Sequence, residues 1–408
     1  MISLLPIILI VFVLASLFRV AFIYHVLYVL VAVTLLARAW ASIVARRLTL
    51  DRAYPERALN GETARVELKL RNGSALPVAW LKLHDRLPVE LSAAAVFDRA
   101  LSLGPNGEAT FGYELHCRQR GWYRLGPLSI ETGDVLGLNL YRREFDSERR
   151  LLVYPKILTP SALGLSSRTP FGDVRSRQPL YEDPARSAGV RDYQPGDSLR
   201  KIHWRTSASL GRLQVRKLEP AMTLRTMVVL DLNLIAYQQA GRAHYATELA
   251  IVAAASLAND LVERRQEIGL LSNGRDPAAD DDAGHLHVPP RKGRAQLTRV
   301  LDALARVQAR TATPIETLLR DALGQLSWGA TIVVVTGEAT EALRGALTQL
   351  RRAGFAVVVV VVSQVSPYGE GTALGGLGVP LHYVWRESDI DDVDEPGPRR
   401  RPAQLAAS

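Results

Sequence analysis

Two parts of this 408-residue sequence hold side chains whose types and spacing could do chemistry. The first is the segment from Arg186 to Lys217, which contains eight Lys or Arg residues and only two acids. Such a surplus could bind an acidic protein, a phosphate or a lipid headgroup, although most charged surface runs are merely solvated. The second is Asp231, which ends an apolar run and precedes Asn233 by two positions. Carboxylate and amide oxygens in this arrangement could ligate a hard divalent cation.

Signatures of catalysis are weaker. Gly196-Asp197-Ser198-Leu199 spells a signature of some serine esterases, and Asp282-Ala283-Gly284-His285 spells the Asp-x-x-His that they also use. The esterase serine should follow a strand of an α/β domain, but Ser198 lies in a predicted turn ahead of the first such strand. Cys117 is the only cysteine, which excludes an internal disulfide, and its strand pattern predicts a buried, inert thiol. We therefore expect a protein that is not an enzyme, with a serine hydrolase as an alternative.

Residues 2–37 are expected to anchor the chain in a lipid bilayer. Residues 2–18 and 20–37 carry no formal charge, and Arg19 separates them. Each run would rise about 26 Å as a helix, close to the ~30 Å hydrocarbon core, so residues 1–47 are predicted to form a transmembrane helical hairpin. Two alternatives stay open: a single span over residues 20–37 with an interfacial first segment, or a hydrophobic hairpin buried in a soluble protein.

The basic residues after the hairpin predict its orientation. Arg38, Arg46, Arg47 and Arg52 follow the second apolar run. The positive-inside rule places this flank in the cytoplasm, and with two spans the N-terminus lies there too. The expected localisation is therefore the cytoplasmic (inner) membrane, multi-pass, with the soluble domains in the cytoplasm.

Residues 48–158 are predicted to form an antiparallel, Ig-like β-sandwich. Residues 64–70 alternate between polar and apolar side chains, and Asn72-Gly73 follows them as a turn signal. Further alternating runs and turns recur about every 8–12 residues, which is typical of sandwiches. Nothing in this domain resembles an active site.

Residues 224–387 are predicted to form a doubly wound α/β domain. Apolar runs over residues 226–230, 331–335 and 356–362 alternate with helical segments, which favours a parallel sheet covered by helices. Ligands of such sheets bind beyond the carboxyl ends of the strands. Residues 159–223 are then a linker, and residues 388–408, with segregated charge and proline, are typical of a disordered tail.

The basic segment also has a predicted local order. Pro195-Gly196 indicates a turn, Asp197 or Ser198 could cap a short helix through Thr206, and Gly211 would end that helix before a strand over residues 213–218. In this setting we expect the two aromatic side chains, Tyr193 and Trp204, to be packed. We therefore expect no nucleic-acid binding, although the net charge is +9.

The segment resembles the hallmark of domain-of-unknown-function family fifty-eight. The matching residues are Arg191, Tyr193, Pro195, Gly196, Asp197, Arg200, Ile202, Trp204, Ser207, Ala208, Gly211, Leu213, Val215 and Arg216. His203 stands where the family usually has aspartate. Residues 120–127, residues 133–138 and the apolar hairpin are similar to that family as well. We take as the candidate partner-binding site Arg191, Tyr193, Pro195, Gly196, Asp197, Arg200, His203, Trp204, Arg205, Ser207, Gly211 and Arg216.

The resemblance implies a membrane-tethered protein with a degenerate von Willebrand factor A-like domain. Such domains hold a metal with Asp-x-Ser-x-Ser, a distant Thr and a later Asp. Here the first loop offers Asp231 and Asn233 but places Ile235 third, and the later loop reads Thr336-Gly337-Glu338. The distant hydroxyl could come from either of two threonines, Thr311 and Thr313. Because two oxygens are lost from the metal shell, we expect neither tight Mg²⁺ binding nor any other cofactor.

The resemblance also implies partners, because such proteins are often encoded beside MoxR-type AAA+ ATPases and transglutaminase-like membrane proteins. The resulting hypothesis is a membrane-anchored cytoplasmic scaffold or adaptor that binds partner proteins, with a MoxR-type AAA+ ATPase as the expected partner and no catalysis of its own. The alternative is a divalent-cation-dependent, adhesion-type binding module.

Overall fold

The computed structural model describes residues 5–18, 20–135, 137, 139–145, 149–159, 182–194, 197–199, 202–220, 225–240, 243–279, 285–311, 313–322, 329–363, 374 and 377–390. The chain divides into two compact units. One comprises Met1–Lys156 with Leu304–Arg306, and the other comprises Ile157–Ala303 with Val307–Ser408. The fold is mixed, with apolar N-terminal helices, several sheets and helices around one of the sheets.

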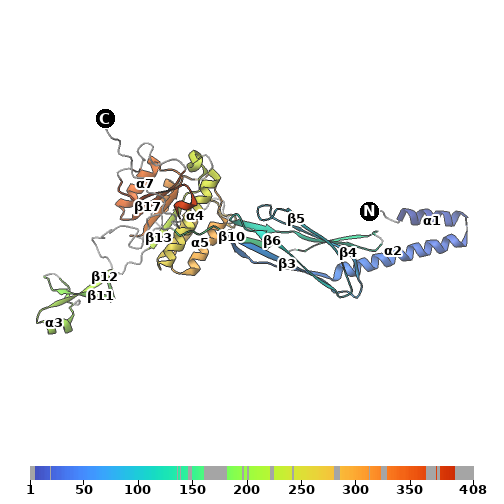
Figure 1. The fold of residues 1–408 in the computed structure, drawn as a ribbon, viewed down its shortest axis with the longest axis horizontal. Helices are drawn as coiled ribbons and strands as arrows, with labels where there is room; N and C mark the ends of the chain where they lie inside the picture. The colour runs from blue at the N-terminus through green and yellow to red at the C-terminus, as the bar shows by residue number, and fades with distance from the viewer. Residues whose placement is uncertain are drawn as a thin grey trace, which may run out of the picture. The chain divides into compact units, whose positions relative to one another are not determined.

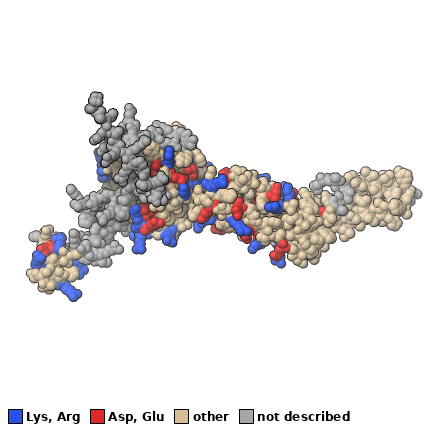
Figure 2. Space-filling model, viewed as in Figure 1, with Lys and Arg blue, Asp and Glu red and all other residues tan. Residues whose placement is uncertain are grey.

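The N-terminal helices are α1 (Leu5–Phe18) and α2 (Ala21–Arg47), and α1 folds back alongside α2 (Figure 1). Of the described helices, two are long and apolar enough to cross a membrane, namely α2 and α4 (Ala243–Glu263). Most of α4 is buried within its own unit, as expected of a core helix, whereas α2 is mostly exposed. Figure 2 shows α1 and the first part of α2 as a surface without Lys, Arg, Asp or Glu. The chain therefore has a candidate membrane helix near its N-terminus.

The first unit continues with three sheets, in the strand orders β1-β3-β6, β2-β10-β7 and β5-β4-β8-β9. Their strands are β1 (Leu48–Ala53), β2 (Arg57–Leu59), β3 (Thr63–Asn72), β4 (Val78–Arg86), β5 (Val96–Leu103), β6 (Glu108–His116), β7 (Gly121–Leu125), β8 (Leu128–Gly133), β9 (Leu140–Phe145) and β10 (Arg149–Tyr154). The alternating sequence explains the shared core: Leu68 of β3 and Leu81 and Leu83 of β4 are fully buried in one cluster. The Cys117 thiol is buried too, as expected, and burial raises its pKa.

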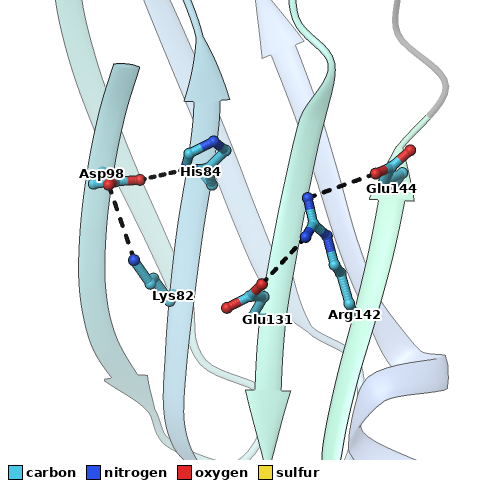
Figure 3. A network of polar contacts seen from close by, with 6 residues as sticks. All are labelled: Lys82, His84, Asp98, Glu131, Arg142 and Glu144. Atoms are coloured by element: carbon cyan, nitrogen blue, oxygen red, sulfur yellow. Dashed lines mark hydrogen bonds and ion pairs between the residues drawn. The ribbon is translucent and has the colours of Figure 1, made fainter. Parts of the chain in front are cut away.

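The other face of the β5-β4-β8-β9 sheet is polar, because alternate side chains of a strand point to opposite faces. On this face His84 Nδ1 lies 2.7 Å from Asp98 Oδ1, and Arg142 lies between Glu131 and Glu144 (Figure 3). These exposed pairs contribute little to stability.

Several features of this unit differ from the prediction, and two of them have a clear cause. Strand β10 pairs with β2 in parallel, so the arrangement is not purely antiparallel. The three-residue β2 is too short to carry a periodic signal that would have indicated its partner. Strand β5 was not predicted, because three consecutive exposed residues interrupt its alternation.

A buried ion pair lies inside the first unit. Arg52 Nη2 donates to Asp85 Oδ1 over 2.5 Å, and the two side chains are only 2% and 0% exposed. Tyr113 donates its hydroxyl proton to Asp85 Oδ2 over 2.7 Å, and Arg52 Nη1 donates to the Leu125 carbonyl over 3.1 Å. Burial raises the pKa of Asp85 even though the Arg52 guanidinium lowers it.

The second unit contains a six-stranded sheet of order β15-β14-β13-β16-β17-β18. Its strands are β13 (Arg225–Leu230), β14 (Glu267–Ser272), β15 (Leu286–Arg291), β16 (Thr331–Thr336), β17 (Ala356–Val362) and β18 (Leu381–Val384). The helical elements in this part of the chain are η2 (Leu234–Ala240), α4, α5 (Arg294–Arg306), α6 (Ile315–Ala322), α7 (Glu341–Arg352) and η3 (Glu387–Asp389). All neighbouring strands are parallel except the β14–β15 pair. The predicted parallel sheet is thus present, with one antiparallel edge strand.

The strand order brings the carboxyl ends of three strands, β13, β14 and β16, together. Strand β13 lies between β14 and β16, which is the point where the winding direction of the sheet reverses. Element η2 follows β13 and packs closely against the loop after β16. A Cβ on Gly337, in that loop, would come within 2.5 Å of the Ala236 carbonyl oxygen. Only glycine therefore fits there, and the loop after β16 is held near Asp231.

Candidate partner-binding site

The family motif forms a small folded module. It consists of β11 (Glu182–Asp192), the short helix α3 (Trp204–Leu210) and β12 (Gln214–Pro220), and β11 and β12 pair antiparallel. The pairing places Arg191 opposite Val215 and Asp192 opposite Gln214. Strand β11 was not predicted, since the pattern of residues 159–223 indicates a linker.

Arg191 and Asp197 hold the turn of the module. The guanidinium donates two hydrogen bonds to the carboxylate, Nη1 to Oδ2 over 2.7 Å and Nη2 to Oδ1 over 2.6 Å. Asp197 Oδ2 also accepts from the backbone N–H of Gln194 over 3.0 Å. A planar fork of this kind fixes both side chains, so the pair helps to build the module.

A second set of contacts joins the start of the motif to its end. Asp192 accepts from Arg212 Nη1 over 3.1 Å and from the side-chain amide of Gln214. The Tyr193 N–H donates to the Leu213 carbonyl over 2.9 Å. Tyr193 itself is half-buried, in partial agreement with the prediction that it is packed.

The helix begins later than predicted. His203 is its N-cap, and His203 Nδ1 accepts from the Thr206 N–H over 3.2 Å. The histidine thus makes the capping contact that the family's usual aspartate could make at this position. Ile202 is buried and bridges to Val215 just before the helix, so the helix does not start at Asp197 or Ser198, where a cap was expected. Gly211 ends the helix in the left-handed conformation at φ 66°, as predicted.

Ser207 ties the helix to the strand. Its hydroxyl donates to the His203 carbonyl over 3.0 Å and accepts from the Gln214 N–H over 2.8 Å. The side chain is buried, so its part in the motif is structural.

Several apolar side chains of the module are exposed. We call this set the motif surface; it comprises Val190, Leu199, Trp204, Leu210 and Leu213. Trp204 is 67% exposed and Leu199 is 65% exposed, so the prediction that Trp204 is packed is wrong. Trp204 is the first residue of this seven-residue helix, so no earlier helical turn covers its side chain.

The module also carries two exposed positive charges. Arg205 and Arg216 are exposed, and neither is in an ion pair with another residue that the structure describes. Tryptophan and arginine are the side chains that contribute most often to the binding energy of protein interfaces. Three predicted site residues, Pro195, Gly196 and Arg200, lie outside the described residues.

Asp231, the first residue of the degenerate metal motif, accepts hydrogen bonds from several protein donors. Asp231 Oδ1 accepts from the Asn233 N–H over 3.0 Å and from the Asn273 side-chain amide over 2.8 Å. Thr336 donates its hydroxyl to Asp231 Oδ2 over 2.9 Å. Both carboxylate oxygens of Asp231 therefore accept hydrogen bonds from N–H and O–H groups of the protein in this arrangement. Within the described part of the chain, no three His, Cys, Asp or Glu side chains are grouped as a metal site.

Two members of this network were not predicted in their roles. The hydroxyl beside Asp231 comes from Thr336, whereas the Thr313 carbonyl accepts from Asn273 Nδ2 over 2.9 Å and the side chain of Thr311 is exposed. Asn273, directly after β14, also accepts the Leu232 N–H over 2.7 Å. Its position after a buried strand was the available signal, because the ends of neighbouring parallel strands meet.

Replacing Asp231 by Asn should change how stability depends on pH. Burial raises the pKa of Asp231, opposed by its hydrogen bonds to Asn273, Asn233 and Thr336. The carboxyl then binds its proton more tightly in the folded state, so wild-type stability falls as pH rises from about 4 through the raised pKa. Asn cannot ionise. We therefore expect the stability of the Asp231→Asn variant relative to wild type to improve as pH rises.

The measurement is hydrogen exchange of the β13 and β16 amides at several pH values. If the difference in stability between wild type and Asp231→Asn were the same at every pH, the burial of an ionisable carboxyl would be contradicted. The matched control is Glu316→Gln, which removes an acid whose charge also raises the Asp231 pKa. Because this control lowers the Asp231 pKa, the pH range over which stability falls should become narrower, but the fall itself should remain.

The esterase signature does not gather into a site among the described residues. Ser198 is exposed, and its predicted partner Asp282 lies outside the described residues.

The described geometry defines a class of protein: a chain with apolar N-terminal helices, β-sheets beside them, and an α/β unit that carries a motif module. Residues 189–371 match the family described as "Protein of unknown function DUF58". The resemblance inferred from the motif is thereby confirmed over these residues. The match begins within β11 and includes α3, β12 and the sheet as far as β17.

The chain is also similar to an uncharacterized protein of Bacillus subtilis, YeaD. The two are 26% identical over 287 residues, which is 69% of this chain and 68% of the relative. Among solved structures, the CARDB domain of a Pyrococcus furiosus protein aligns with a TM-score of 0.19 at 17% identity, over 26% of this chain and 86% of that domain. The pilus adhesin SpaC of Lactobacillus rhamnosus GG aligns with a TM-score of 0.30 at 10% identity, over 42% of this chain and 29% of the adhesin.

Proposed function

We propose that this chain is a membrane-anchored adaptor that binds a partner protein through its motif surface and catalyses no reaction. The observation that carries the proposal is that the acidic residues of the motif are paired inside the module while its tryptophan is exposed. Its acids are engaged inside the module, Asp197 by Arg191 and Asp192 by Arg212, while Trp204 remains 67% exposed. A folded module that presents an aromatic side chain to solvent is suited to binding another protein.

The chemistry of the surface indicates what the partner must offer. Trp204 and Leu199 need an apolar pocket, and the positive charges of Arg205 and Arg216 favour acidic residues around it. By family resemblance we propose a MoxR-type AAA+ ATPase as this partner, with a transglutaminase-like membrane protein as a further member of the assembly. Nucleic acid is a poorer candidate, because binding along a phosphate backbone draws on many cations and the described part of the module offers few beside its motif surface.

The anchor and the fold complete the proposal. We propose that α1 and α2 form a hairpin in the cytoplasmic (inner) membrane and that the basic flank of α2 keeps the sheets in the cytoplasm. The first unit would be an Ig-like sandwich that acts as a spacer. The second would be a degenerate von Willebrand factor A-like domain whose Asp231 network replaces a metal. The strand order with Asp231 at the reversal point supports this interpretation.

The experiment is a binding titration with the whole chain in lipid nanodiscs. A purified MoxR-type AAA+ ATPase from the organism that encodes the chain is added with and without a non-hydrolysable ATP analogue, and binding is followed by interferometry. We expect saturable binding that weakens as salt is raised, because charges surround the apolar contact. No binding in either nucleotide state would overturn the choice of partner.

The cation-dependent alternative is tested in the same nanodiscs. If Mg²⁺ or Mn²⁺ produced heat of binding and raised the melting temperature, and if Asp231→Asn abolished both effects, the adhesion-type module would replace the adaptor. The proposed adaptor predicts no response to either ion.

A further inference from the structure

The loop between β8 and β9 lies where α2 leaves its apolar segment. Tyr141, the second residue of β9, has its hydroxyl oxygen 3.5 Å from the carbonyl oxygen of Arg38. Arg38 is the first charged residue after the apolar run of α2. The loop before β9 is therefore on the side of the sheets from which the candidate membrane helix emerges.

Helix α2 is firmly attached to the sheets beyond this point. Its 27 residues span about 40 Å at 1.5 Å per residue, more than the ~30 Å hydrocarbon core. The surplus is its C-terminal end, where Ala41 and Val44 are buried and the Trp40 indole donates to the Pro77 carbonyl over 3.0 Å. The helix passes directly into β1, so no flexible linker separates the sheets from the bilayer.

The described residues of the loop are joined by hydrogen bonds around Asp134. The buried Asp134 accepts from the Asn139 N–H over 2.8 Å and from the Asn139 side-chain amide over 2.6 Å. The Gly137 N–H donates to the Asp134 carbonyl over 3.1 Å, and the Trp80 indole donates to the same carbonyl over 3.3 Å. Polar groups that are satisfied internally lower the cost of placing a loop against lipid.

The same loop exposes apolar side chains. Val135 is 70% exposed and Leu140 is 47% exposed, whereas most valines and leucines of the neighbouring strands lie in the core. Gly137 at φ 70° allows the tight turn between them. Leu136 and Leu138 of the same family-like stretch lie outside the described residues.

We propose that Val135 and Leu140 insert into the interface of the bilayer beside α2, so that the first unit is seated on the lipid surface. The inference rests on the proposed membrane anchor, and it adds a second attachment to it. An apolar loop next to a membrane helix gains by leaving water at about 25 cal/mol per Å² of apolar surface, and the arginine at the end of the span can reach the lipid phosphates. Two attachments would hold the sheets in one orientation.

The test is fluorescence of single labels on the whole chain in nanodiscs. An environment-sensitive fluorophore is attached at Val135→Cys, and lipids with a spin label just below the headgroup are added as quenchers. The native Cys117 is 1% exposed, and wild type labelled in parallel measures any background from it. Val89→Cys is the matched control, because Val89 is 68% exposed and follows β4 at the end opposite to Val78 and the β8–β9 loop. Leu35→Cys, in the apolar segment of α2, reports on the anchor itself.

We expect a blue-shifted emission and quenching at positions 135 and 35, and neither effect at position 89. Quenching at 35 with a water-like, unquenched label at 135 would overturn the seating of the loop and leave the anchor intact. A blue shift at 135 without quenching would also overturn it, because the loop would then be covered by protein. If position 35 were unquenched as well, the membrane anchor itself would be wrong.

Discussion

Replacing Asp85 by Ala should lower the unfolding free energy of the first unit by about 3–5 kcal/mol, because it leaves a buried guanidinium without its counter-ion. The Arg52 and Asp85 side chains are 2% and 0% exposed, so water cannot take over the charge that remains. The Tyr113 hydroxyl loses its acceptor in the same variant. We expect hydrogen exchange of the β3 and β4 amides to accelerate accordingly.

The matched controls separate charge from packing. Asp98→Ala removes an exposed acid that pairs with His84 on the opposite, polar face of the same sheet, and it should cost less than about 1 kcal/mol. The double variant Arg52→Met with Asp85→Leu removes both charges and should recover most of the loss, since apolar pairs often replace buried ion pairs without penalty. A loss for Asp85→Ala no larger than that for Asp98→Ala would contradict the buried pair.

Replacing Trp204 by Ala should weaken partner binding by about 30-fold or more, which corresponds to the roughly 2 kcal/mol or more typical of an aromatic hot spot. The side chain is 67% exposed and supports no described hydrogen bond, so its loss should leave the module folded. The measurement is the Kd of the nanodisc-embedded chain for the AAA+ ATPase. Exchange of the β11 and β12 amides should be unchanged.

The control for this variant is a second tryptophan outside the module. Trp385 is 36% exposed in the second unit, and Trp385→Ala should change the Kd less than about twofold, as most positions outside an interface do. Arg191→Gln is the structural counterpart: it breaks the bidentate contact to Asp197, so it should weaken binding and accelerate amide exchange together. If both tryptophan variants bind equally well, the motif surface is not the docking site.

Much of the fold follows from the sequence where the period is strong. The alternation at Leu68 and Leu70, the pure valine run of β17 and the break near Arg19 each specify an element without help from distant residues. The α/β pattern likewise predicts a parallel sheet. The strand order, and with it the meeting of Asp231, Asn273 and Thr336, depends on packing between segments about 40 and 100 residues apart, which no local pattern encodes.

The motif shows where local reasoning fails. Gly211 was predictable because a left-handed residue ends a helix wherever it occurs. The exposure of Trp204 was not predictable, because large aromatic side chains are highly buried on average. Here the short helix leaves the side chain uncovered. The pairing of Arg191 with Asp197 was equally hidden, since a basic run looks the same whether its charges are free or paired.

Photo-crosslinking from position 204 in the native membrane tests the adaptor hypothesis most directly. A benzophenone amino acid replaces Trp204 in one strain and Trp385 in another, and the products are probed for the MoxR-type AAA+ ATPase. Position 204 should give a crosslink to the ATPase whose yield changes when a non-hydrolysable nucleotide is added, and position 385 should give none. A crosslink from position 385 alone, or from neither position while both proteins are present in the membrane fraction, would contradict the hypothesis.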